Sequence, residues 1–198
     1  MNGRIAILVF LLITMGCLAG NAEMVTITTI PAGGAVTGSP GQTVGWGFTI
    51  TNSTPYYLLF DASYFCEPGQ DPASTTCTQS LGTYQDYIAN NGTEIAPMSM
   101  LTESFNANTM TGFGAYNISP TALVGATDSG NLVATYMEYQ GDPFNGGTQV
   151  SGDIELSAPA SVTVVAATPE PPSGILITLG GLGALLCRTR FRRPPNTA

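Results

Sequence analysis

The chain of 198 residues contains no lysine and no histidine, and its five arginines all lie near the two ends, at positions 4, 188, 190, 192 and 193. The 13 carboxylates all lie between these arginines, so residues 23–172 carry 13 acids and no base, a formal charge of −13 against −8 for the whole chain. Without cations this region cannot neutralise phosphates, which excludes nucleic acid as a partner and disfavours anionic lipid headgroups. It also cannot form internal salt bridges, so its fold must depend on apolar burial and backbone hydrogen bonds.

The same absences exclude most enzyme chemistry. Without histidine there is no Ser-His-Asp or Cys-His arrangement, and without lysine there is no Schiff-base chemistry. No Cys-x-x-Cys motif and no calcium-loop motif is present. Glycoside hydrolysis needs only two facing carboxylates, for which Asp86, Glu94 and Glu138 are the candidates. We therefore expect a non-enzymatic protein with no catalytic, cofactor-binding or metal-binding residue and no cofactor, and a carboxylate-only hydrolase is the least favoured alternative.

The N-terminal residues 1–22 have the three parts of a signal peptide. Arg4 supplies the positive charge, residues 5–13 (IAILVFLLI) form the apolar run, and Gly20-Asn21-Ala22 places small residues before a cut after Ala22. The apolar run is much shorter than the roughly 20 residues that span a membrane. A lipoprotein cut before Cys17 is the alternative. The segment predicts export and removal by signal peptidase.

The C-terminus combines a proline-rich segment, an apolar segment and a cluster of arginines. Residues 169–173 read PEPPS, residues 174–187 read GILITLGGLGALLC, and four arginines fall within residues 188–193. As a helix the apolar segment is about 14 residues, or roughly 21 Å, which is short for a hydrocarbon core about 30 Å thick. The arginines favour keeping this end in the cytoplasm. With the signal peptide, they predict a topology in which the bulk of the chain lies outside.

This ordered set resembles the PEP-CTERM sorting domain of Gram-negative bacteria. The matching residues are Pro169, Glu170, Pro171, Ser173, Arg188, Arg190, Arg192 and Arg193, with the short helix between them. The resemblance implies transient anchoring in the inner membrane by a short transmembrane helix, recognition by an exosortase, cleavage near the PEP triplet and transfer to the cell surface or extracellular matrix. A plain tail anchor, which needs no such motif, is the alternative.

The middle of the chain has the pattern of short strands separated by turns. Residues 43–51 (TVGWGFTIT) alternate, with Val44, Trp46, Phe48 and Ile50 on one face, as in a half-buried strand. Further strands are predicted at residues 24–30, 56–60, 63–66, 84–88, 99–105, 114–119, 132–140, 149–156 and 160–167. Turns are predicted at residues 39–41, 90–92, 128–130 and 145–147, which are rich in Gly, Pro, Asn, Asp and Ser.

This punctuation predicts an all-β fold, a single antiparallel β-sandwich of immunoglobulin-like or similar type, with Trp46 buried between its sheets. The run Gly114-Ala115-Tyr116-Asn117-Ile118 resembles the Gly-x-Tyr-x-apolar run of an immunoglobulin strand F. Residues 41–165 are similar to a domain found upstream of PEP-CTERM tails, a similarity that implies no activity. The predicted organisation is a signal peptide (1–22), a β-sandwich (23–168), the sorting tail (169–193) and a disordered end (194–198).

Two of the four cysteines remain for the folded region. Cys17 leaves with the signal peptide and Cys187 lies in the C-terminal apolar segment, so Cys66 and Cys77 are left on either side of a Pro- and Gly-rich loop. In an oxidising exported setting they are expected to form a local disulfide. Closing a loop of this size stabilises a fold by about 3 kcal/mol in the chain-entropy model.

The function expected from these features is that of a surface or extracellular-matrix protein associated with exopolysaccharide. The alternative is a carbohydrate- or Ca²⁺-binding module, suggested by the uncompensated acids and by several tyrosines able to stack on sugars. Tyrosine is also a common strand residue, and this structural interpretation is the favoured one. The tyrosines concerned are Tyr56, Tyr57, Tyr84, Tyr87, Tyr136 and Tyr139.

Overall fold

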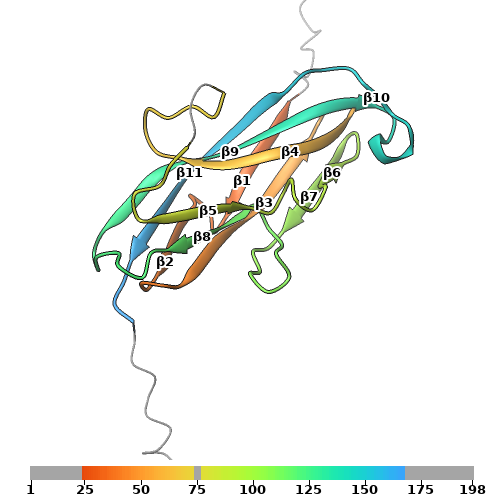
Figure 1. The fold of residues 1–198 in the computed structure, drawn as a ribbon. Helices are drawn as coiled ribbons and strands as arrows, with labels where there is room; N and C mark the ends of the chain where they lie inside the picture. The colour runs from red at the N-terminus through yellow and green to blue at the C-terminus, as the bar shows by residue number, and fades with distance from the viewer. Residues whose placement is uncertain (1–23, 74–76, 168–198) are drawn as a thin grey trace, which may run out of the picture.

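A computed structural model describes residues 24–73 and 77–167, which form two sheets packed face to face (Figure 1). The first sheet has the order β1 (Val25–Ile30), β3 (Thr43–Asn52), β8 (Gly114–Ile118) and β5 (Gly82–Asp86), and β7 (Ser99–Glu103) also pairs with β3. The second has the order β2 (Ala35–Gly38), β11 (Ile154–Val164), β9 (Thr127–Gln140), β4 (Tyr57–Cys66) and β6 (Glu94–Ile95). β10 (Thr148–Gln149) pairs with β9, after the short 3₁₀ helix η1 (Pro143–Asn145). The predicted all-β sandwich is confirmed.

The strand order is that of an immunoglobulin sandwich. Taken in chain order, β1, β3, β4, β5, β8, β9 and β11 occupy positions A to G, because one sheet then reads A-B-E-D and the other G-F-C. All these neighbours are antiparallel, whereas β2 joins the outer edge of β11 in parallel, with Ser161 opposite Ala35 and Val164 opposite Gly38. The run at residues 114–118 forms β8, in position E. The resemblance of this run to an immunoglobulin strand F is therefore local, because β9 occupies that position.

The core lies between the sheets and is built around Trp46. The alternation predicted for residues 43–51 is confirmed, because Trp46, Phe48 and Ile50 are fully buried on the inner face of β3. The Trp46 ring stacks on Phe65 of the opposite sheet at a centroid distance of 5.6 Å and meets Tyr116 edge-on at 6.4 Å. Its indole N–H donates to the carbonyl oxygen of Gly34 at 2.7 Å, in the connection that carries the chain from the first sheet to the second.

Three predicted boundaries are wrong, each because tertiary pairing overrides the local pattern. Residues 56–60 and 63–66 belong to one strand, β4, whose register shifts at a bulge between Phe60 and Ala62. Residues 149–156 and 160–167 contribute to a single β11 that begins at Ile154 and continues through Pro159. The turn predicted at residues 128–130 is instead part of β9, where Asp128 pairs with Val162 of β11.

The two ends of the described chain lie at opposite ends of the sandwich (Figure 1). β1 begins at one pole, and β11 ends at the other. Backbone hydrogen bonds join the loops of this second pole: Val165 N donates to Gly38 O at 2.9 Å, and Gly125 N donates to Val164 O at 2.8 Å. We call residues 39–42, 119–126 and 165–167 the C-terminal pole. Within residues 24–73 and 77–167, no helix is long and apolar enough to cross a membrane.

Candidate functional site

The disulfide is the one predicted site feature that falls within the described residues. Cys66, the last residue of β4, is bonded to Cys77 with an S–S distance of 1.98 Å and a Cα–Cα distance of 4.8 Å, which confirms the predicted pair. The cleavage residue Ala22 and the sorting-tail residues lie outside the described part of the chain. The latter are Pro169, Glu170, Pro171, Ser173, Arg188, Arg190, Arg192 and Arg193.

The carboxylates considered for glycosidase chemistry are not brought together as a facing pair. Glu138 of β9 lies opposite Leu58, and Glu94 of β6 lies opposite the next residue, Leu59. Because successive strand residues point to opposite faces, Glu94 and Glu138 lie on opposite faces of their sheet. Asp86 belongs to the other sheet, and its carboxylate accepts hydrogen bonds from the Ser63 hydroxyl at 2.6 Å and from the Ser63 amide at 3.1 Å. Asp86 therefore joins β5 to the edge of β4.

Half of the tyrosines considered for sugar stacking are structural. Tyr87 and Tyr136 are buried, and Tyr87 stacks on Phe105 at a centroid distance of 6.2 Å. Tyr84 is within hydrogen-bonding distance of the Ser63 hydroxyl, at 2.8 Å, and burial raises the pKa of its phenol well above the ordinary value. Tyr57 and Tyr139 are half-buried and lie opposite each other on β4 and β9. The favoured interpretation of the tyrosines as strand and core residues therefore holds for Tyr84, Tyr87 and Tyr136.

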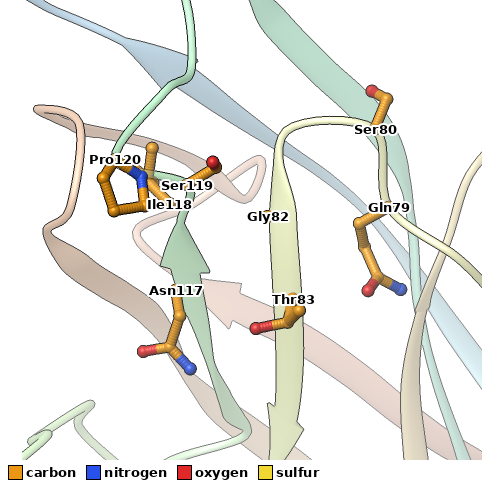
Figure 2. A pocket seen from close by; sticks show the side chains of 8 residues that line it. All are labelled: Gln79, Ser80, Gly82, Thr83, Asn117, Ile118, Ser119 and Pro120. Atoms are coloured by element: carbon orange, nitrogen blue, oxygen red, sulfur yellow. The ribbon is translucent and has the colours of Figure 1, made fainter.

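A cleft of about 490 Å³ lies where β5 begins and β8 ends (Figure 2). Asn117 of β8 and Thr83 of β5 are directly opposite in the ladder, and Figure 2 shows their side chains side by side on the same face. The Asn117 side chain is oriented by the Thr43 hydroxyl, which donates to Asn117 Oδ1 at 2.7 Å and leaves the amide N–H group turned to the cleft. The complete lining is Gln79, Ser80, Gly82, Thr83, Asn117, Ile118, Ser119 and Pro120.

The lining of this cleft combines polar and apolar groups and carries no charge, although the domain carries many acids. Gln79 is held by three hydrogen bonds: its amide donates to Phe65 O and Cys77 O, and its carbonyl accepts from Tyr84 N. It therefore shapes the wall, whereas the exposed Thr83 hydroxyl and the Asn117 amide face the open space. Hydroxyl and amide groups beside an apolar ring such as Pro120 suit a neutral, hydroxyl-rich ligand.

A pair of carboxyl groups beside the cleft was not anticipated from the sequence. Asp128 is only 2% exposed, accepts a hydrogen bond from the Tyr116 hydroxyl and is hydrogen-bonded to the carboxyl group of Glu67. Burial raises the pKa of the Asp128 carboxyl group, and the hydrogen bond to Glu67 raises this pKa further. Glu67 in turn accepts from the amide of Ser80 in the cleft wall at 2.5 Å. The pair thus links the start of β9 to the segment that shapes the cleft.

A second, acidic hollow of about 300 Å³ lies on the outer face of β4, β9 and β11. Asp61, Asp153 and Glu155 line it, and Asp61 accepts a hydrogen bond from the Thr135 hydroxyl at 2.7 Å. Among residues 24–73 and 77–167, no group of three or more His, Cys, Asp or Glu side chains is arranged to hold a metal ion.

Fold and clefts together define this part of the chain as an acidic, disulfide-linked β-sandwich of immunoglobulin-like strand order. No model of a known protein family matches the chain, and no curated protein is significantly similar to it.

Proposed function

We propose that this protein is an exported, non-enzymatic β-sandwich that a PEP-CTERM sorting tail delivers to the surface or extracellular matrix of a Gram-negative-type bacterium. The observation that carries the proposal is the Cys66–Cys77 disulfide in a chain that also has a signal peptide and the ordered tail motif. Stable structural disulfides belong to oxidising compartments outside the cytoplasm. The geometry is compatible with the tail motif, because the last described residue, Ala167, lies two positions before Pro169 and at the pole opposite the N-terminal end.

Intact-mass analysis of surface material tests this proposal. In a host with an exosortase, the mature chain should begin at Glu23 and should lack the segment containing Arg192. The variant Glu170→Ala should keep that segment, because it destroys the PEP triplet. The matched control Pro172→Ala removes a neighbouring proline outside the triplet and should be processed normally. Wild-type surface material that retains Arg192 throughout would contradict the proposal.

A second candidate function is favoured by the neutral cleft between β5 and β8, namely attachment to an uncharged extracellular polysaccharide. An acidic domain without cations is repelled by anionic polymers, whereas a cleft lined by hydroxyl and amide groups has no such barrier. The variant Thr83→Ala should weaken binding to a neutral glycan on an array. The control Gln85→Ala changes an exposed residue farther along the same face of β5, outside the lining, and should not. Equal binding by both variants would exclude the cleft.

A further inference from the structure

The acids of this domain are unevenly distributed, and one pole lacks them. The segments that meet at the C-terminal pole, residues 31–42, 117–127 and 156–167, contain no Asp or Glu. Nearby carboxyl groups, those of Asp128 and Glu67, are hydrogen-bonded to each other, and Asp128 is buried. In a region of formal charge −13, this pole is therefore a surface that an anionic partner can approach with little repulsion.

The tip of the same pole is apolar and exposed. Leu123 and Val124 are 77% and 60% exposed, and Val165 beside them is 40% exposed. They are held in place by the backbone: Ala126 N donates to Leu123 O at 3.1 Å, and Val164 N donates to Ala126 O at 2.9 Å. Gly125 occupies the turn with a φ of +91°, a conformation that side chains disfavour. Two adjacent aliphatic side chains are thus presented outward on a firmly bonded turn rather than packed inward.

The opposite pole also exposes apolar side chains, but there they accompany carboxylates. Phe144 is 63% exposed, and its amide is capped by the carboxylate of Asp142 at 2.8 Å. Asp142 also acts on Glu94, whose pKa is raised first by burial and then by the negative charge of Asp142. Charge, rather than exposed apolar area, therefore distinguishes the two poles.

The chain leaves the described structure at the C-terminal pole, close to its apolar segment. Only six residues, 168–173, separate Ala167 from Gly174, the first residue of the apolar segment. The seven residue steps from Ala167 to Gly174 span at most about 25 Å when fully extended. If the apolar segment enters a bilayer, the pole that carries Leu123 and Val124 is held within that distance of the lipid surface (Figure 1).

We propose that the C-terminal pole docks on the lipid bilayer through Leu123 and Val124 while the sorting tail is still attached. This inference rests on the proposed function, because the tail must hold the chain at the membrane. The absence of acids lets the pole approach anionic headgroups, and the two aliphatic side chains enter the headgroup region. Docking on this pole makes the long axis of the sandwich point away from the membrane. It also keeps the PEP triplet at the depth in the membrane region where a membrane-embedded enzyme acts.

Depth-dependent quenching tests the contact. The chain from Glu23 to Ala198, with Cys187→Ser, is reconstituted into vesicles of phosphatidylethanolamine and phosphatidylglycerol containing headgroup-nitroxide lipid. An environment-sensitive fluorophore is attached through Leu123→Cys or, as the matched control at the opposite pole, Phe144→Cys. Flotation of the vesicles reports separately whether the chain is anchored. We expect a floating chain, strong quenching of the Leu123 label and little quenching of the Phe144 label.

A second experiment removes the exposed apolar side chains of the C-terminal pole without changing the tail, and compares the result with a control variant elsewhere. The double variant L123D/V124D, labelled through Val165→Cys, should float normally but lose most of the quenching. The control Met98→Asp, which changes a residue 74% exposed outside this pole, should keep it. A floating chain with unquenched or equally quenched labels would overturn the docking while leaving the anchor intact. A chain that does not float would overturn both.

Discussion

Replacing Trp46 with phenylalanine should destabilise the sandwich by more than the loss of ring volume alone. The indole N–H donates to the carbonyl of Gly34 at 2.7 Å, and both groups lie away from water. The Gly34 carbonyl keeps a second hydrogen bond, from the amide of Ser161 at 2.9 Å, so losing the indole donor costs about 0.5–1.5 kcal/mol. The smaller ring leaves roughly 40 Å³ unfilled between Phe65 and Tyr116, which adds about 1 kcal/mol at ~24 cal/mol per Å³. The expected loss of unfolding free energy is therefore about 1.5–2.5 kcal/mol.

Urea unfolding followed by far-ultraviolet circular dichroism measures this loss, because Trp46 is the only tryptophan and cannot itself serve as the probe in the variant. The matched control is Phe65→Leu, which removes a fully buried ring that stacks on Trp46 but makes no side-chain hydrogen bond. If W46F loses no more stability than F65L, the Trp46–Gly34 hydrogen bond contributes nothing net, and the reasoning is refuted.

Two other predictions concern the disulfide and the carboxyl pair. Replacing Cys66 and Cys77 with alanine opens a loop of sequence separation 11 and should lower the free energy of unfolding by about 3 kcal/mol. The melting temperature should then fall by about 6–12 °C. An unchanged melting temperature after reduction of the wild type would contradict this. Burial raises the pKa of Asp128 in the folded state above its ordinary value of 3.8. The stability that this group contributes is therefore present at low pH and is lost as the pH rises from 3.8 through the pKa of the folded state. Over this range a second negative charge forms beside Glu67. Asp128→Asn should flatten that decline in urea-unfolding free energy, whereas the exposed control Asp153→Asn should not, and equal slopes would argue against the raised pKa of Asp128.

The sequence predicts the strands whose pattern reflects burial on one face. β3 follows the alternation closely, because its inner side chains enter the core while its outer threonines face solvent or β7. β4 was divided in two because Asp61 falls at the bulge, where the alternation is interrupted and the side chain turns outward to Thr135. Such a bulge depends on the partner strand, which local sequence does not specify.

The errors in β9 and β11 have the same origin. Gly130 suggested a turn, but it lies in β9 where a Cβ would come within 2.2 Å of the Cys66 carbonyl oxygen, so the strand needs glycine for close approach. Two strands were predicted, ending at residue 156 and beginning at residue 160, yet Pro159 between them lies in β11. It precedes the stretch where β2 pairs, so its missing N–H leaves no hydrogen bond to β2 unmade. In these two strands glycine and proline serve close packing and strand pairing, whereas a sequence pattern alone takes them as signs of a turn.

The candidate surfaces were largely hidden from the sequence because they are assembled from distant segments. Glu67 and Asp128 lie far apart in the chain, as do Thr83 and Asn117, and only the sandwich brings each pair together. The absence of acids at the C-terminal pole, by contrast, is present in the sequence as three acid-free segments. It becomes a single surface only when backbone hydrogen bonds join Gly38 to Val165 and Gly125 to Val164.

The parallel pairing of β2 with β11 has a mechanical consequence. β11 is bonded on both sides, to β9 over ten residue pairs and to β2 over four, and the chain leaves from its end toward the C-terminal pole. A pull on that end, with the opposite pole held, runs along the strands, so these hydrogen bonds are loaded together in shear and not peeled apart one at a time. A domain pulled by its C-terminal end therefore resists unfolding, because the strand that bears the force, β11, is itself hydrogen-bonded on both sides.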